Sequence, residues 1–140
     1  MPAQCVEVAD LLTAHINTFA GLPAGLTASR LWIPYKRRNV TALTICVVVD
    51  LRVLTVEARG KDKNEHNPLV IIQSPIDPKD NTEADTIAEL TEEIEKHVLR
   101  FNLSDNYRWK RQTETILNED WLSDSGFFWS AFQPGYEFIA

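Results

Sequence analysis

The chain has 140 residues, of which 44% are hydrophobic and 24% are charged. This balance is typical of one globular domain with a single core, spanning residues 1–140, and it excludes a disordered chain. The formal net charge of −6 disfavours a domain that wraps nucleic acid, because such binding needs a cationic face toward the phosphates.

No apolar run approaches the roughly 20 residues needed to cross a bilayer, and the N-terminus lacks a basic-then-apolar signal sequence. We therefore expect a soluble protein with no membrane partner, made in a cytoplasm. Cys5 falls in a predicted helix and Cys46 in a predicted strand. We expect both to be small buried residues without a disulfide, and neither has a metal-ligand spacing.

The first predicted element is an amphipathic helix from about residue 2 to residue 19. Its apolar stripe has a spacing of three and four residues and includes one histidine. The stripe consists of Val8, Leu11, Leu12, His15, Ile16 and Phe19. Gly21, Pro23 and Gly25 then end the helix.

A short strand is predicted at residues 29–35, where Pro34 confines it to a sheet edge or terminates it. The densest positive cluster of the chain follows directly, at Lys36, Arg37 and Arg38. This cluster indicates either a contact with an anion or a protein partner, or a solvated turn between strands.

Residues 41–72 form the centre of the predicted sheet. They are dense in Val, Ile and Thr, which favour pleated strands, and we expect two or three consecutive strands. The nearly continuous apolar run at 43–49 is typical of a central strand covered on both faces, whereas 51–57 alternates like a strand with one wet face. A strand resumes at 69–72.

Residues 59–67 contain no large apolar residue, so they predict a solvated hairpin tip or a mobile arm that a partner could contact. The cations of this segment are Arg59, Lys61 and Lys63.

The clearest helix of the sequence follows a turn-rich connector at residues 74–81. Its predicted core face carries Ile87, Leu90, Ile94, His97, Val98 and Phe101. The other face is acidic, with Glu89, Glu92, Glu93 and Glu95 as candidate contacts to a basic neighbour. A simply solvated face is the alternative.

Two more strands are predicted, one at residues 107–115 and a final one at residues 127–132 that continues through 133–135 to 136–139. The element order is helix, strand, two or three strands, helix and two strands. It predicts an α+β fold: a single domain with a largely antiparallel sheet, two α-helices packed on one face, and an extended β-hairpin or arm.

The sequence offers little catalytic chemistry. His15 and His97 lie on apolar helical faces, where semi-buried, partnered rings are expected, and His66 lies in the predicted polar hairpin tip. Nucleophile-elbow serines, phosphate-binding glycine loops and metal-ligand clusters are absent from the sequence, so we predict no enzyme, no cofactor and no metal.

A Mg²⁺-dependent nuclease is the enzymatic alternative. It would place Asp50, Glu57 and Arg59 on neighbouring strands. In that arrangement the carboxylates hold Mg²⁺ and the cation stabilises the phosphorane charge.

The order of several short strings forms a pattern from about residue 6 to residue 139. After a helix ending in Thr-Phe, the pattern continues through Arg30–Pro34, Val47–Val49, the charged hairpin, Val70–Gln73, Glu92–Ile94, a tryptophan-bearing strand and a final strand. Together these features resemble the small tail-completion proteins of tailed bacteriophages, and most of all the tail-terminator group related to the minor tail proteins of lambda-like phages.

The resemblance implies an α+β subunit that forms a homohexameric ring on the tail tube, ends tube polymerisation and joins the tail to the head. Its implied partners are copies of itself, the major tail (tube) protein and the head-side connector or neck protein, while DNA only passes through the lumen. It implies a place in the virion tail or neck after assembly in the host cytoplasm, and no catalytic residues. Another head–tail joining protein, such as a neck or stopper subunit, is the alternative of the same class.

By position, the resemblance places the charged hairpin where an arm faces a neighbour or the tube. The charges add a hypothesis of their own. Lys36, Arg37 and Arg38 of one subunit would meet the acidic helix face of the next, giving a head-to-tail contact that closes into a ring.

Overall fold

The computed structural model describes residues 3–50, 55–56, 62–63, 65–77, 79, 81–118, 121–122 and 126–139. Its helices are α1 (Gln4–Asn17), α2 (Asn81–Val98) and the short 3-10 helix η1 (Arg37–Asn39). Its strands are β1 (Ala28–Leu31), β2 (Thr44–Val48), β3 (Thr55–Val56), β4 (Asp62–Lys63), β5 (Glu65–His66), β6 (Leu69–Pro75), β7 (Tyr107–Gln112), β8 (Ile116–Leu117), β9 (Phe127–Phe132) and β10 (Pro134–Phe138). The predicted α+β class is confirmed.

The main sheet has the strand order β1-β2-β6-β9-β8, with β1 and β8 at its two edges. Neighbouring strands are antiparallel except β1 and β2, which run parallel with Ala28 opposite Ile45. Parallel neighbours need a crossover connection. Residues 32–43, which include η1, form that crossover, and the sequence did not reveal it because they read as an ordinary turn.

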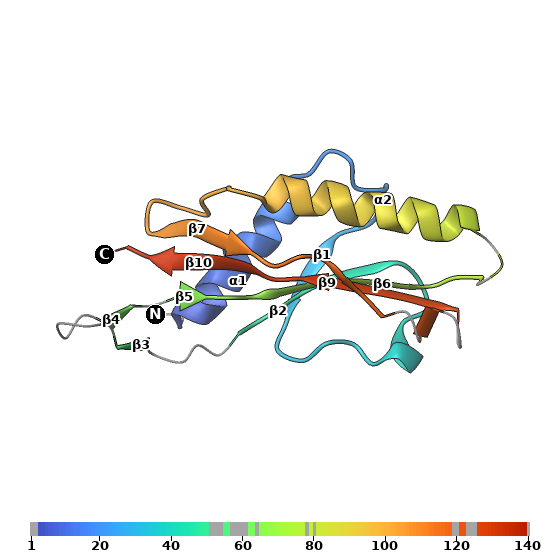
Figure 1. The fold of residues 1–140 in the computed structure, drawn as a ribbon, viewed down its shortest axis with the longest axis horizontal. Helices are drawn as coiled ribbons and strands as arrows, with labels where there is room; N and C mark the ends of the chain where they lie inside the picture. Colours follow the sequence, from blue (N-terminus) through green and yellow to red (C-terminus); the bar gives the residue numbers. More distant parts are fainter. Residues whose placement is uncertain are drawn as a thin grey trace.

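Both helices cover the same face of the main sheet, as predicted (Figure 1). Leu12 of α1 and Ile94 of α2 are fully buried in one cluster with Ile45, Ile72 and Phe132 of the strands. A smaller cluster of Cys46, Ile71 and Ala131 lies on the opposite face of the sheet. Both cysteines are buried and unpaired, as expected.

The predicted antiparallel sheet is divided in the structure, because β5, β10 and β7 form a separate antiparallel sheet with β10 in the middle. The break falls after β5, at Asn67-Pro68, and after β9, at Gln133-Pro134. Proline has no N–H to donate to a β-ladder. Pro68 therefore separates β5 from β6, and Pro134 separates β9 from β10 at the matching position of the neighbouring strand.

The prediction of a solvated tip over residues 59–67 is wrong for its last part. Glu65 and His66 form β5, and His66 is only 1% exposed, opposite Tyr136 of β10. Pairing in the second sheet buries a residue that looks polar in sequence. Earlier in the segment, β3 and β4 pair antiparallel, as a hairpin requires. Arg59 and Lys61, and most of the strand predicted at 51–57, lie outside the described residues.

Helix α2 ends at Val98, three residues before the predicted core position Phe101, which is 42% exposed. Arg100 has φ of 60°, a left-handed conformation that stops a right-handed helix. Of the other predicted core positions of α2, Ile87, Leu90, Ile94 and Val98 are buried, and His97 is half-buried. In the described part of the chain, neither helix has the length and apolarity to span a bilayer.

Two buried tyrosines of the second sheet differ in how their hydroxyl groups are satisfied. The Tyr107 hydroxyl donates a hydrogen bond to Glu7 Oε2 at 3.0 Å, and burial together with that carboxylate raises the pKa of Tyr107 to about 12. The Tyr136 hydroxyl is buried with no hydrogen-bond partner among the described residues, and burial raises its pKa above the ordinary value.

We expect Tyr136→Phe to leave stability unchanged or to raise it by up to about 1 kcal/mol, because a buried hydroxyl without a partner is unfavourable. The matched variant Tyr107→Phe should lose about 1–2 kcal/mol, because it removes a hydrogen bond to a charged group. Urea unfolding of both variants measures the difference. A Tyr136→Phe variant that is less stable than Tyr107→Phe would contradict this expectation.

Candidate functional site

The loop that follows β1 exposes large apolar side chains. The strand ends at Leu31, so Trp32 and Ile33 fall outside the predicted strand at residues 29–35 and are 52% and 76% exposed. Tyr35 is exposed as well. Exposed apolar side chains that form a contiguous patch mark a contact surface. Pro34 was the feature of the sequence that could have indicated this exposure, since proline stops a strand.

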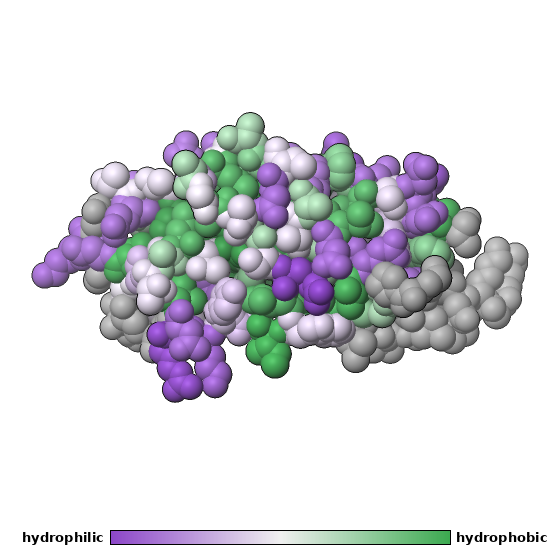
Figure 2. Space-filling view, turned by 180° about the vertical axis from the view of Figure 1, so that it is seen from behind, coloured by the Kyte–Doolittle hydropathy of each residue, from purple (hydrophilic) through white to green (hydrophobic). Residues whose placement is uncertain are grey.

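Two of the three predicted cations flank these apolar side chains. Lys36 and Arg38 are exposed, and Arg38 lies in η1; the side chain of Arg37, also in η1, lies outside the description. Figure 2, seen from behind, shows a strongly hydrophobic group projecting where Figure 1 places this loop, with hydrophilic groups beside it. We call residues Trp32, Ile33, Tyr35, Lys36 and Arg38 the β1 loop surface.

At the opposite edge of the main sheet, a cavity of about 350 Å³ lies between α2 and strands β8 and β9. We call it the α2–β8 cavity. Its lining includes Ala88, Thr91, Glu92, Glu95, Leu117 and Phe128. Leu117 and its neighbour Ile116 are exposed at this edge, and neither is among the candidate residues predicted from sequence. Their sequence pattern gives little indication of a contact site, because two apolar residues between polar stretches are common in any strand.

Glu95 is fixed at the rim of the α2–β8 cavity. Its carboxylate accepts a hydrogen bond from the hydroxyl of Thr115, and its backbone oxygen accepts one from Gln112 Nε2 at 3.1 Å. Glu92 is exposed on the same flank, and Lys96 also lines the cavity. The rim therefore carries two carboxylates and one ammonium group.

The predicted acidic face of α2 is divided by the structure. Glu89 and Glu93 line a second cavity of about 250 Å³ on the other flank of the helix, toward Pro23 and Leu43. Glu92 and Glu95 instead line the α2–β8 cavity, on the flank that faces β8. The members of each pair are three or four positions apart, as residues on one helical flank are. Only the second pair lies at a sheet edge.

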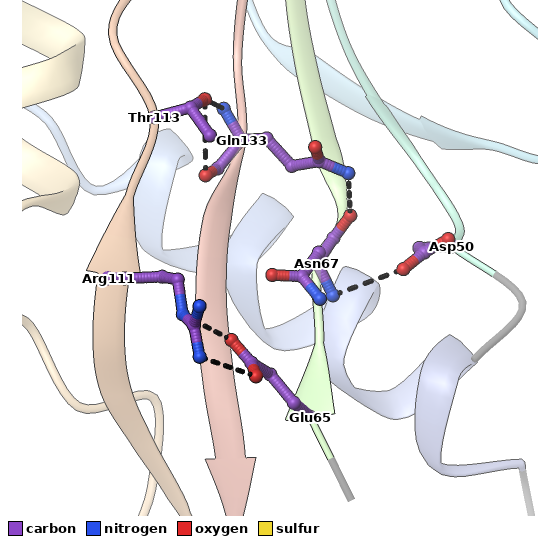
Figure 3. Close-up of polar contacts among 6 residues, drawn as sticks. All are labelled: Asp50, Glu65, Asn67, Arg111, Thr113 and Gln133. Atoms are coloured by element: carbon purple, nitrogen blue, oxygen red, sulfur yellow. Dashed lines mark hydrogen bonds and ion pairs between the residues drawn. The ribbon is translucent and has the colours of Figure 1, made fainter. Parts of the chain in front are cut away.

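Asp50, the candidate nuclease carboxylate, takes part in the junction between the two sheets (Figure 3). It accepts a hydrogen bond from the Asn67 backbone N–H at 3.3 Å, and Gln133 Nε2 donates to the Asn67 backbone oxygen at 2.6 Å. The Gln133 backbone also exchanges hydrogen bonds with Thr113. These contacts replace the β-ladder hydrogen bonds that are missing where the prolines interrupt the ladder.

Glu57 and Arg59, the other nuclease candidates, lie outside the described residues. Lys63, a predicted contact residue, lies in β4.

Next to this junction, Arg111 of β7 reaches across β10 to Glu65 of β5 (Figure 3). Its Nε and Nη2 atoms lie 2.8 and 3.0 Å from the two carboxylate oxygens. The space for this ion pair above β10 exists because residue 135 is glycine, which has no side chain. A Cβ there would lie 2.7 Å from Asn67 Oδ1 and 2.9 Å from Glu65 Oε1.

We expect Gly135→Ala to lower stability by about 1–2 kcal/mol, because the new methyl group displaces both side chains and disturbs a two-bond ion pair. The same substitution in a Glu65→Ala background should be markedly milder, since one of the two displaced side chains is gone. Urea unfolding of the four proteins in this cycle gives the coupling. Equal losses in both backgrounds would show that the close approach to Glu65 is unimportant.

The last turns of the two helices are joined by a pair of histidines. The Nε2 atoms of His15 and His97 each lie 2.9 Å from the other residue's backbone oxygen, and the rings stack with centroids 4.1 Å apart. Phe101 stacks on His15 as well. Semi-buried, partnered rings are thus confirmed at both positions. Burial lowers the pKa of His15, with the nearby His97 adding a smaller lowering and the hydrogen bond opposing both.

We expect stability to fall as the pH decreases through 6.5, the ordinary pKa of histidine. Because the folded-state pKa of His15 is lowered, the unfolded chain takes up this proton first, so the stabilisation is present above 6.5 and is lost below it. Urea unfolding at about pH 7.5 and pH 5.5 measures the loss. A His15→Gln variant should show a smaller loss over that range, and an equal loss would assign the pH dependence to other groups.

Within the described ranges, no group of three or more His, Cys, Asp or Glu residues is arranged to hold a metal ion. No protein-family model matches the chain, and no curated protein matches it.

The candidate site consists of two surfaces at opposite edges of the main sheet. One is the apolar and cationic β1 loop surface, and the other is the α2–β8 cavity with its partly acidic rim.

Proposed function

We propose that this chain is a structural subunit of a tailed bacteriophage that forms a ring on the tail tube, ends tube polymerisation and joins the tail to the head. The observation that carries the proposal is the placement of two unlike exposed surfaces at opposite edges of one sheet. The β1 loop surface lies at one edge and the α2–β8 cavity at the other.

Unlike surfaces on opposite sides of a subunit favour a head-to-tail contact between copies. Such a contact uses a different surface from each copy, so an open row of subunits leaves one surface unoccupied at each of its two ends. A closed ring is the arrangement in which both surfaces of every copy are occupied. The sixfold symmetry comes from the resemblance to tail terminators.

The charges support the same pairing. Lys36 and Arg38 accompany the apolar side chains of the loop, whereas Glu92 and Glu95 stand at the cavity rim. Opposite charges at the edge of an apolar contact raise the association rate and fix the register. The net charge of −6 suits a channel through which DNA passes without binding, because carboxylates repel phosphate.

The direct test is the length of tails assembled without this protein, in the phage that encodes it. Particles that lack a terminator should carry tail tubes longer than normal and unattached to heads, and supplying the chain should restore both properties. Normal-length tails that fail to join heads would instead favour a neck or stopper subunit. Complete, infectious particles would overturn the structural role.

A further inference from the structure

The Trp32 and Ile33 side chains are the strongest unassigned feature of the described residues. They are adjacent in the sequence, directly after the end of an edge strand, and are largely exposed. Aromatic and aliphatic side chains of this kind act as anchors when a partner offers a pocket that excludes water. Two such anchors on a single loop require an apolar hollow of matching size.

The α2–β8 cavity provides that hollow. Its volume of about 350 Å³ lies in the range of pockets that hold a small organic molecule, so it can receive one or two large side chains. Phe128 and Leu117 supply apolar walls, and Ala88, which is exposed, adds a small side chain to the lining. The buried hydroxyls of Thr91 and Ser130 lie 3.2 Å apart and can satisfy each other.

Charge complementarity selects a second copy of the chain as the occupant. Lys36 and Arg38 follow the two anchors by three to six positions in the same connection between β1 and β2. The cavity carries Glu92 and Glu95 at its rim, with Lys96 leaving one net negative charge there. Glu89 and Glu93 of α2 line the second cavity on the other flank of the helix, so they lie away from this contact.

We propose that Trp32 and Ile33 of one subunit enter the α2–β8 cavity of the next subunit, with Lys36 and Arg38 facing Glu92 and Glu95. This inference rests on the proposed ring and names the contact that closes it. It makes the α2–β8 cavity a receptor for a protein side chain.

Mixed cross-linking tests the contact. One variant carries Ile33→Cys and a second carries Ala88→Cys, and a short bismaleimide is added to each variant alone and to their mixture. The native Cys5 and Cys46 are buried, and burial raises the pKa of Cys46 to about 11, so both should react slowly. We expect cross-linked dimers from the mixture and none from either variant alone.

A matched control replaces Ala88→Cys with Glu93→Cys, which is also exposed on α2 but on the opposite flank. This second mixture should give at most a tenth of the product. Dimers from the Ile33→Cys variant alone, or equal yields in the two mixtures, would overturn the proposed contact.

A charge exchange gives an independent readout. Arg38→Glu should weaken self-association about tenfold, and adding Glu92→Arg should restore most of it, whereas adding Glu93→Arg should not. Light scattering separates the two proposals. If rings form but neither cross-links nor charge rescue appear, this contact is wrong and the ring remains; if the chain never self-associates, even with its tail tube, the ring itself is wrong.

Discussion

Replacing Trp32 and Ile33 together with alanine should weaken self-association by a factor of about 100 to 1,000 while leaving the fold intact. Interface anchors that fill a pocket contribute about 2 kcal/mol or more each, and 1.4 kcal/mol corresponds to a factor of ten. Both side chains are largely exposed in the isolated subunit, so their loss should change the free energy of unfolding by less than about 0.5 kcal/mol. Sedimentation or light scattering over a concentration series measures the first quantity, and urea unfolding measures the second.

Leu99→Ala is the matched control. Leu99 is also an exposed apolar residue, but it follows the end of α2 and belongs to neither surface. We expect its substitution to leave self-association unchanged. If Leu99→Ala weakened assembly as much as the double variant, general hydrophobicity would account for association and the β1 loop surface would have no specific role.

The largest effect on stability should come from Ile94→Ala, with a loss of about 3–4 kcal/mol. Ile94 is fully buried where α2 packs on α1 and the main sheet, and truncation leaves a cavity that the surrounding side chains fill only in part. The neighbouring Glu93→Ala, on the exposed side of the helix, should change the free energy of unfolding by less than about 0.5 kcal/mol. Urea unfolding measures both variants.

A loss below about 1 kcal/mol for Ile94→Ala would mean that α2 is held only loosely against the sheet. The α2–β8 cavity would then lack a fixed wall, because α2 supplies Thr91 and Glu95 to its lining. This stability measurement therefore also bears on the proposed contact.

The parts of the fold that were predictable from sequence are those with a long, regular pattern. Leu12 and Ile16 in α1, and Leu90 and Ile94 in α2, repeat at helical spacing and are buried on one face of the sheet. Dense β-branched residues likewise revealed β2 and β6. Periodicity is strong in these segments because a single buried face imposes it over several turns or residues.

Short or long-range features were not predictable. His66 looks polar beside Glu65, yet it is buried against β10, where its partner Tyr136 lies 70 positions further along the chain. The parallel pairing of β1 with β2 depends on a crossover that leaves no local pattern. In both cases the deciding contacts are tertiary, and a sequence window does not contain them.

The candidate site was predictable in part. Lys36 and Arg38 stood out as a positive cluster, and both are exposed in the connection between β1 and β2. The division of the four glutamates between two flanks became visible only once the neighbours of α2 were known. Trp32 and Ile33 were missed because the sequence assigned them to a strand that ends at Leu31.

The head-to-tail ring is tested most directly by native mass spectrometry of the chain over a range of concentrations, alone and with its tail tube. The account predicts that free subunits give way to one closed species, with the same number of copies at every higher concentration and no larger polymers. A symmetric dimer as the final state, polymers that lengthen with concentration, or a subunit that stays single even on the tube would contradict it.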